Sequence, residues 1–85
     1  MTLEQLRIFV AVAEREHLTQ AADALNLTPS AVSSAIRVLE DRYGIALFHR
    51  TGRRIALTQT GQAFLPEAKA TLARAGSADL FLTEI

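Results

Sequence analysis

The stretch from Leu18 to Leu39, LTQAADALNLTPSAVSSAIRVL, decides the fold of this 85-residue chain. In each half, apolar side chains recur at the spacing of one helix face, which predicts two short helices that bury a shared stripe. The stripe consists of Leu18, Ala22 and Leu25, then Leu27 in the turn, then Val32, Ile36 and Leu39. Two helices joined by so tight a turn indicate a helix-turn-helix motif.

The boundaries of these helices are marked by capping residues. The hydroxyl of Thr28 can cap the second helix, and Pro29 fits the first helical position, where its missing N–H does no harm. Thr19 is expected to cap the first helix of the pair. The predicted break between the helices therefore falls at Thr28.

An opening helix is predicted over residues 2–15, because Thr2 and Gln5 have the spacing of a capping box. We expect its buried face to consist of Leu3, Leu6, Val10 and Ala13. This helix supplies the third wall of the core.

A polar stripe runs along the outer face of the second helix of the motif. It consists of Ser30, Ser33, Ser34 and Arg37, spaced i, i+3, i+4 and i+7. Short hydroxyls and one guanidinium make a slim surface that can lie in the major groove of DNA. An ordinary solvated helix face is the alternative, because serine is common on surface helices.

Two short apolar runs follow, at residues 44–50 and 55–58, and they predict a hairpin. The turn between them, residues 51–54, contains Gly52 and ends in Arg53 and Arg54. Arginines at such a tip can follow phosphates or enter a narrow minor groove, where the negative potential is enhanced. A solvated basic loop is the alternative, but the position directly after a groove-shaped helix favours DNA.

The charge is balanced over the whole chain, with nine basic and nine acidic residues, but it is unevenly distributed. Residues 28–62 hold five arginines against two acidic residues, whereas residues 1–27 hold two basic residues against four acidic ones. Positive charge is therefore concentrated where the contact with DNA is predicted.

A set of residues at fixed spacing runs through most of the chain. They are Leu3, Leu6 and Phe9; Ala21, Ala22 and Leu25; Ala31, Val32, Ser33, Ile36, Leu39 and Glu40; Gly44, Leu47, Phe48 and Arg50; and Leu57, Thr58 and Gly61. In this arrangement the chain resembles the LysR-type transcriptional regulators, over about residues 1–75. The resemblance implies a winged helix-turn-helix, a long linker helix that pairs two copies, and binding to interrupted dyad sites near promoters.

Pattern and resemblance together predict one set of DNA-binding residues. They are Thr19, Gln20, Thr28, Pro29, Ser30, Ser33, Ser34, Arg37, Arg50, Arg53 and Arg54. The resemblance implies that Ser33 contacts phosphate, that Arg53 enters the minor groove, and that Arg50 ties the wing to the core or to a phosphate. The chain departs from the family at Pro29, commonly glutamine, and at Ser34, often arginine. Base specificity then rests more on short side chains and DNA shape.

A long helix is predicted from about Thr58, its cap, to the C-terminus. Its seam residues alternate steps of four and three, which is typical of a helix that pairs. They are Gly61, Leu65, Ala68, Leu72, Ala75, Asp79 and Leu82, of which Leu65, Ala68, Leu72, Ala75 and Leu82 are predicted to form a homodimer interface. Pro66 is expected to bend the helix, and Asp79 indicates fraying or a partner contact beyond Gly76. Folding of Phe64 and Leu65 back onto their own domain is the alternative.

The predicted fold class is mainly α. Residues 1–58 form a winged helix-turn-helix of three helices and a two-stranded wing, and residues 59–85 form a linker and dimerisation helix. A chain of this length buries only about 60–65% of its surface, so a second copy would help to stabilise it. The resemblance implies a further ligand-sensing domain, which this chain lacks, so we expect a fragment whose small-molecule inducer acts through the absent domain.

Other classes of function have little support. There is no cysteine, and His17 and His49 have no partner at a ligand or relay spacing, so we expect no enzyme, metal or cofactor. No apolar run approaches the length of a membrane span, and we expect a cytoplasmic, nucleoid-associated protein. The rival is a winged helix that binds protein, which should expose an apolar or acidic patch in place of the serines and arginines.

Overall fold

The computed structural model of the protein describes residues 1–52 and 54–85. Its elements are α1 (Leu3–Arg15), α2 (Leu18–Leu25), α3 (Pro29–Tyr43), β1 (Phe48–Thr51), β2 (Arg54–Leu57) and α4 (Gln59–Thr83). The two strands pair antiparallel, with Phe48 opposite Leu57 and Thr51 opposite Arg54. The prediction of a mainly α, winged helix-turn-helix fold with a long final helix is confirmed.

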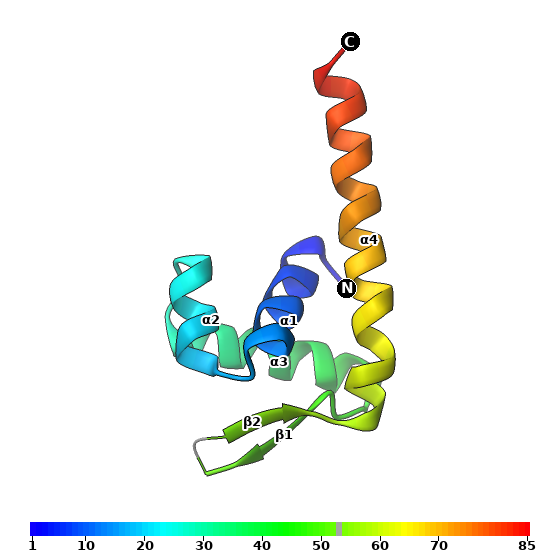
Figure 1. The fold of residues 1–85 in the computed structure, drawn as a ribbon. Coiled ribbons are helices and arrows are strands. Elements are labelled where there is room, and N and C mark those ends of the chain that lie inside the picture. The colour runs from blue at the N-terminus through cyan, green and yellow to red at the C-terminus, as the bar shows by residue number, and fades with distance from the viewer. Residues whose placement is uncertain (53) are drawn as a thin grey trace.

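Helices α1, α2 and α3 form the head of the molecule, with the wing along one side and α4 standing beside them (Figure 1). The first half of α4 packs against α1, whereas its second half projects beyond the head, and the molecule measures 49 by 25 by 20 Å. Helices α2 and α3 lie next to the wing, so the segments predicted to meet DNA are on one side.

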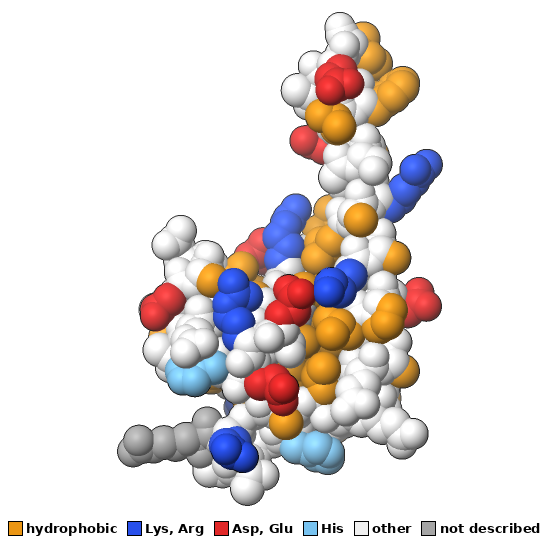
Figure 2. Space-filling view, viewed as in Figure 1, with side chains coloured by type: hydrophobic (Ala, Val, Ile, Leu, Met, Phe, Trp, Pro, Cys, Tyr) orange, Lys and Arg blue, Asp and Glu red, His pale blue; other side chains and the backbone are white. Residues whose placement is uncertain are grey.

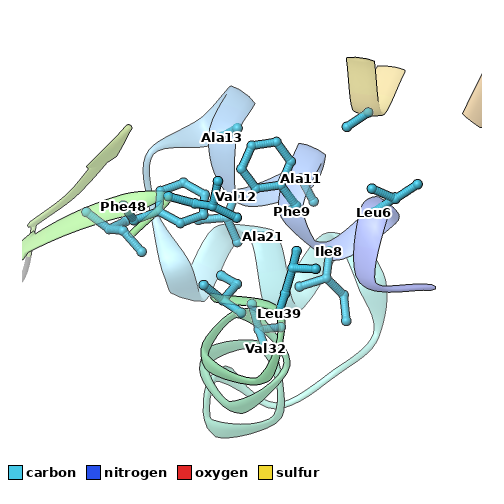
Figure 3. Close-up of a cluster of buried hydrophobic side chains, with 14 of the residues drawn as sticks. Leu6, Ile8, Phe9, Ala11, Val12, Ala13, Ala21, Val32, Leu39 and Phe48 are labelled. Carbon is cyan, nitrogen blue, oxygen red and sulfur yellow. The ribbon is translucent and has the colours of Figure 1, made fainter. Parts of the chain in front are cut away.

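The core is centred on Phe9 of α1, which is fully buried. Its ring lies 5.4 Å from the ring of Phe48 in β1 and 5.0 Å from that of Phe64 in α4, measured between centroids. Figure 3 shows Phe9 and Phe48 in this cluster, with Val32 and Leu39 entering from α3. One aromatic side chain therefore joins the head, the wing and the linker helix.

The predicted buried face of α1 was partly wrong. Leu6 and Ala13 are buried as predicted, but Leu3 is 42% exposed and Val10 is only partly buried. Three residues outside the predicted face, Ile8, Phe9 and Val12, are buried as well. The reason is that α1 contacts α2, α3 and α4, so it buries more than the single stripe of a surface helix.

Three of the predicted caps are confirmed. Thr2 and Gln5 form the capping box, Thr28 accepts from the Ala31 N–H, and Thr58 accepts from the Gly61 N–H. The predicted cap of α2 was wrong, because the helix begins earlier, at Leu18, and Thr19 lies inside it. Nδ1 of His17 accepts the N–H of Gln20 at 3.0 Å instead.

The wing strands are shorter than predicted, since residues 44–47 are not part of a strand. Gly44 ends α3 in the left-handed conformation, with φ of 64°. The carboxylate of Glu40 then accepts the N–H groups of Leu47 at 2.8 Å and Phe48 at 3.3 Å. These backbone groups are therefore satisfied by α3, and strand pairing begins only at Phe48.

Helix α4 runs without interruption from Gln59 through Pro66 to Thr83. The predicted fraying beyond Gly76 was wrong, because the helix continues to Thr83 and the Asp79 carbonyl accepts the Thr83 hydroxyl at 2.8 Å. The alternative, a contact of Asp79 with a partner, stays a prediction. The bend expected at Pro66 stays a prediction.

The start of α4 is held against the segment before the wing. The Thr58 hydroxyl donates to the carbonyl of Ala46 at 2.7 Å, and the Thr58 N–H donates to that of Leu47 at 3.0 Å. Gly61 packs so closely that a Cβ there would lie 2.2 Å from the carbonyl oxygen of Leu47. Gly61 therefore belongs to the core of its own protomer, which corrects its predicted place in a pairing seam.

Gly61→Ala is expected to lower the free energy of unfolding by about 1–3 kcal/mol, because the added methyl meets a backbone carbonyl that cannot move aside. Gly76→Ala is the matched control on the same helix. A Cβ there meets nothing within 4 Å, so this change should stabilise the helix by about 0.5–1 kcal/mol. Denaturant unfolding measures both values, and equal shifts would contradict the packing described for Gly61.

Candidate nucleic-acid interface

The outer face of α3 carries an exposed polar surface near its capped end. Ser30, Ser34 and Arg37 are exposed, as the stripe predicted. The Ser30 hydroxyl also lies 3.2 Å from that of Thr28, in a hydrogen bond next to the helix N-terminus. Backbone N–H groups and hydroxyls are thus gathered at one exposed helix end, where they can donate to base edges or phosphates.

Ser33 departs from the predicted stripe, because it is half-buried at the flank of α3 that faces the wing. Arg50 of β1 donates to it twice, from Nη1 to the hydroxyl and from Nη2 to the carbonyl oxygen at 3.5 Å. The role that the resemblance implied for Arg50, a tie between the wing and the rest of the domain, is therefore present in the structure.

A groove separates the start of α2 from the wing. Its lining includes His17 and Thr19 on one side and Arg50, Gly52 and Arg54 on the other. Thr19 and Gln20 are exposed on the first turn of α2, and the Gln20 N–H is occupied by the His17 cap. The first turn of α2 and the arginines of β1 and β2 therefore face a common space.

The predicted residues Thr28, Pro29 and Arg54 are also exposed, and Arg54 opens β2 opposite Thr51. Arg53, for which a place in the minor groove was predicted, lies outside the described residues. Figure 2 shows basic side chains spread over the head, the wing end and α4, and uncovered apolar side chains along α4 and at its far end.

The predicted pairing residues of α4 fall into two groups. Ala68 is only 1% exposed and belongs to the core, so its predicted contact with a partner was wrong. Leu65, Leu72 and Ala75 are partly buried on the same side, whereas Leu82 is 73% exposed. The reason is that α1 covers the first half of the stripe.

Two functional contributions were not anticipated. His17 caps α2 through a ring nitrogen, although imidazole is not among the usual capping groups. Glu40 anchors the wing through a carboxylate seven residues before the first N–H that it binds. The His17 contact has the usual spacing of a cap, but its residue type gave no signal, whereas the Glu40 contact follows no local spacing rule.

The described residues include no cluster of three or more His, Cys, Asp or Glu side chains suited to a metal ion. Among the same residues, no helix combines the length and the apolar character needed to cross a bilayer.

Comparison with known sequences gives a consistent family. The family model of the bacterial regulatory helix-turn-helix proteins, lysR family, matches residues 3–62. The chain is 46% identical over 72 residues to a probable RuBisCO transcriptional regulator of Thalassiosira pseudonana, covering 85% of the chain and 24% of that protein. It is 44% identical over 80 residues to the Hca operon transcriptional activator HcaR of Escherichia coli K12, covering 94% and 27%. The chain therefore spans about a quarter of the length of these relatives, which are regulators and not enzymes.

Among the solved structures that match nearly the whole chain are two DNA complexes. One is the CbnR_DBD-DNA complex, with a TM-score of 0.92, 33% identity and coverage of 99% of this chain and 97% of that one. The other is the BenM_DBD/catB site 1 DNA complex, with a TM-score of 0.94, 34% identity and coverage of 100% and 94%. The head, the wing and the long α4 thus recur together in proteins crystallised with DNA.

Glu40→Ala is expected to lower the free energy of unfolding by about 1.5–3 kcal/mol, because two N–H groups lose a charged acceptor. Hydrogen exchange at the amides of Leu47 and Phe48 should become faster. Asp41→Ala, an exposed neighbour on α3, is the control and should change the unfolding free energy by no more than about 0.5 kcal/mol. Unchanged exchange at both amides in Glu40→Ala would contradict this anchor.

Proposed function

The chain belongs to the lysR family of bacterial regulatory helix-turn-helix proteins, and from that membership we propose that it binds duplex DNA in transcription regulation, as part of a longer protein. One observation carries the proposal: a capped helix exposes Ser30, Ser34 and Arg37 beside an arginine-bearing wing. The DNA complexes of similar domains support it, because they share the arrangement of these elements at more than 30% identity.

In this proposal α3 enters the major groove with its N-terminal half. Ser30 and Ser34 approach base edges through short hydroxyls, and Arg37 is the one long side chain among the exposed residues of the stripe. Residues at helix starts and on the wing contact the backbone. The full set proposed for DNA is Thr19, Gln20, Thr28, Pro29, Ser30, Ser33, Ser34, Arg37, Arg50, Arg53 and Arg54.

Short reading side chains have a consequence for specificity. A bidentate contact needs an arginine or lysine side chain for guanine, and an asparagine or glutamine side chain for adenine. The hydroxyl side chains of Ser30 and Ser34 cannot make either contact. Selection among sites then depends more on Arg37, on groove width and on the ease with which the duplex bends. Residues 1–58 are the proposed reading unit, and binding to the chromosome would place the protein on the nucleoid.

We further propose that the protein acts as a homodimer paired through residues 59–85. The stripe that remains accessible includes Leu65, Leu72, Ala75 and Leu82. If two copies of α4 run antiparallel about an axis beside residues 73 and 74, Leu65 lies opposite the partner's Leu82, and Leu72 opposite its Ala75. Both halves of the stripe then bury apolar surface, and two heads face the two halves of a dyad site.

An apolar pocket lies away from the proposed reading surface. It opens at the base of α4 and is lined by Met1, Leu39, Tyr43, Ile45, Leu47 and Phe64. It lies at the C-terminal end of α3, opposite the end that carries Ser30, so the reading surface itself is polar and basic. A protein-binding winged helix should have its apolar patch on that surface, which disfavours the rival function.

Binding to duplexes selected from a random pool is expected to weaken with added salt, with a log–log slope of about −0.9 for each phosphate that is neutralised. Arg54→Ala should reduce the size of that slope by about 0.9 and weaken all duplexes alike, because it removes a backbone contact. Fluorescence anisotropy at several salt concentrations measures both.

Arg42→Ala is the control for that experiment, because Arg42 is exposed in the last turn of α3, at the end opposite Ser30, and should leave the slope unchanged. A slope near zero for the wild-type protein would rule out DNA as the partner.

Leu82→Asp is expected to raise the dissociation constant of the dimer at least about tenfold, because a carboxylate would be buried without a partner. Ser77→Asp introduces the same charge on the opposite side of α4 and should leave association unchanged. Sedimentation velocity over a concentration series measures both constants. Equal effects of the two variants would refute pairing through this stripe.

A further inference from the structure

The contact between Arg50 and Ser33 joins the wing to the N-terminal half of the reading helix. Arg50 is the third residue of β1, and Ser33 lies in the second turn of α3, seventeen positions earlier. Both terminal nitrogens of the guanidinium are engaged by this one serine, Nη1 by its hydroxyl and Nη2 by its carbonyl oxygen. A two-point contact of this kind fixes the direction of the serine hydroxyl.

The chemistry of the two groups determines what remains free. Arginine only donates hydrogen bonds and stays charged, so the Ser33 hydroxyl is the acceptor in this contact. A hydroxyl that accepts still has its own proton to donate, and within residues 1–52 and 54–85 no acceptor is recorded for it. Accepting from a cation also polarises the hydroxyl and makes its proton a better donor.

The position of Ser33 indicates which acceptor its hydroxyl proton can reach. Ser33 lies on the flank of α3 between the exposed Ser34 and the wing, so a DNA backbone that runs between helix and wing passes this flank. We propose that Arg50 is a positioning residue, which acts on DNA through Ser33 by holding its hydroxyl in line to donate to a backbone phosphate. This inference rests on the proposed function, since it concerns the same surface.

Direct binding of Arg50 to a phosphate is the competing role, and lysine separates the two. Lysine retains the positive charge but not the two-point contact, so a residue that binds phosphate as a point charge would tolerate Arg50→Lys. A positioning residue would not, because the hydroxyl of Ser33 loses its orientation while the charge remains. Ser33→Ala removes the hydroxyl itself, and then nothing is left for residue 50 to position.

The test is a double-mutant cycle on DNA affinity. Ser33→Ala and Arg50→Lys should each weaken binding to one selected duplex about three- to tenfold, as expected for one lost hydrogen bond. The double variant should bind within about twofold of Ser33→Ala alone. The salt slope of Arg50→Lys should equal that of the wild type, because the charge is retained.

Ser34→Ala combined with Arg50→Lys is the matched control, because Ser34 is the neighbouring exposed serine and makes no recorded hydrogen bond to Arg50. In that pair the two losses should multiply. Denaturant unfolding of every variant shows whether the head stays folded under the binding conditions.

Three results would overturn the proposal: wild-type affinity for Arg50→Lys, losses that multiply in the Ser33→Ala and Arg50→Lys pair, or affinity of Ser33→Ala equal to that of the wild type. In all three the wild-type protein still binds duplex DNA, so the function proposed above is unaffected. Absence of binding by the wild-type protein would overturn both.

Discussion

The packing of Phe9 is the interaction on which the rest of the structure depends. Its ring contacts Phe48 of the wing and Phe64 of α4 from a fully buried position in α1. Offset and tilted aromatic pairs at these separations add stabilisation beyond the apolar area they bury. Because Phe48 and Phe64 pack against the same ring, α1 positions both the wing and the linker helix.

Hydrogen bonds then set the orientation that packing alone leaves open. Glu40 holds the chain as it leaves α3, Arg50 returns from β1 to Ser33, and Thr58 ties the start of α4 to Ala46. These contacts surround a two-stranded sheet that would be marginal in isolation. The wing is therefore fastened to α3, and Arg50 keeps a fixed place beside Ser33 of the reading helix.

Much of this arrangement could be predicted from the sequence, because its signals are local. A hydroxyl at Thr28 followed by Pro29 specifies a helix start within four residues, and Thr58 does the same for α4. Apart from the cap of α2, which is His17 and not Thr19, the failures concern contacts between distant segments. Ala68 matches a seam at helical spacing, but its burial depends on where α1 lies. The exposure of Ser30, Ser34 and Arg37 could be predicted from helix periodicity. The contact of Ser33 with Arg50 could not, because it joins α3 to a strand of the wing.

The far end of α4 has a consequence for handling and assembly. Leu80, Phe81 and Leu82 are consecutive and at least 55% exposed, so at 100° per residue their side chains fan over about 200° of the helix circumference. A single helix packed alongside α4 covers only one side of this apolar surface. Even in a pair of helices, part of this apolar tip stays exposed to solvent and prone to association. Only a partner surface that surrounds the tip can cover it completely.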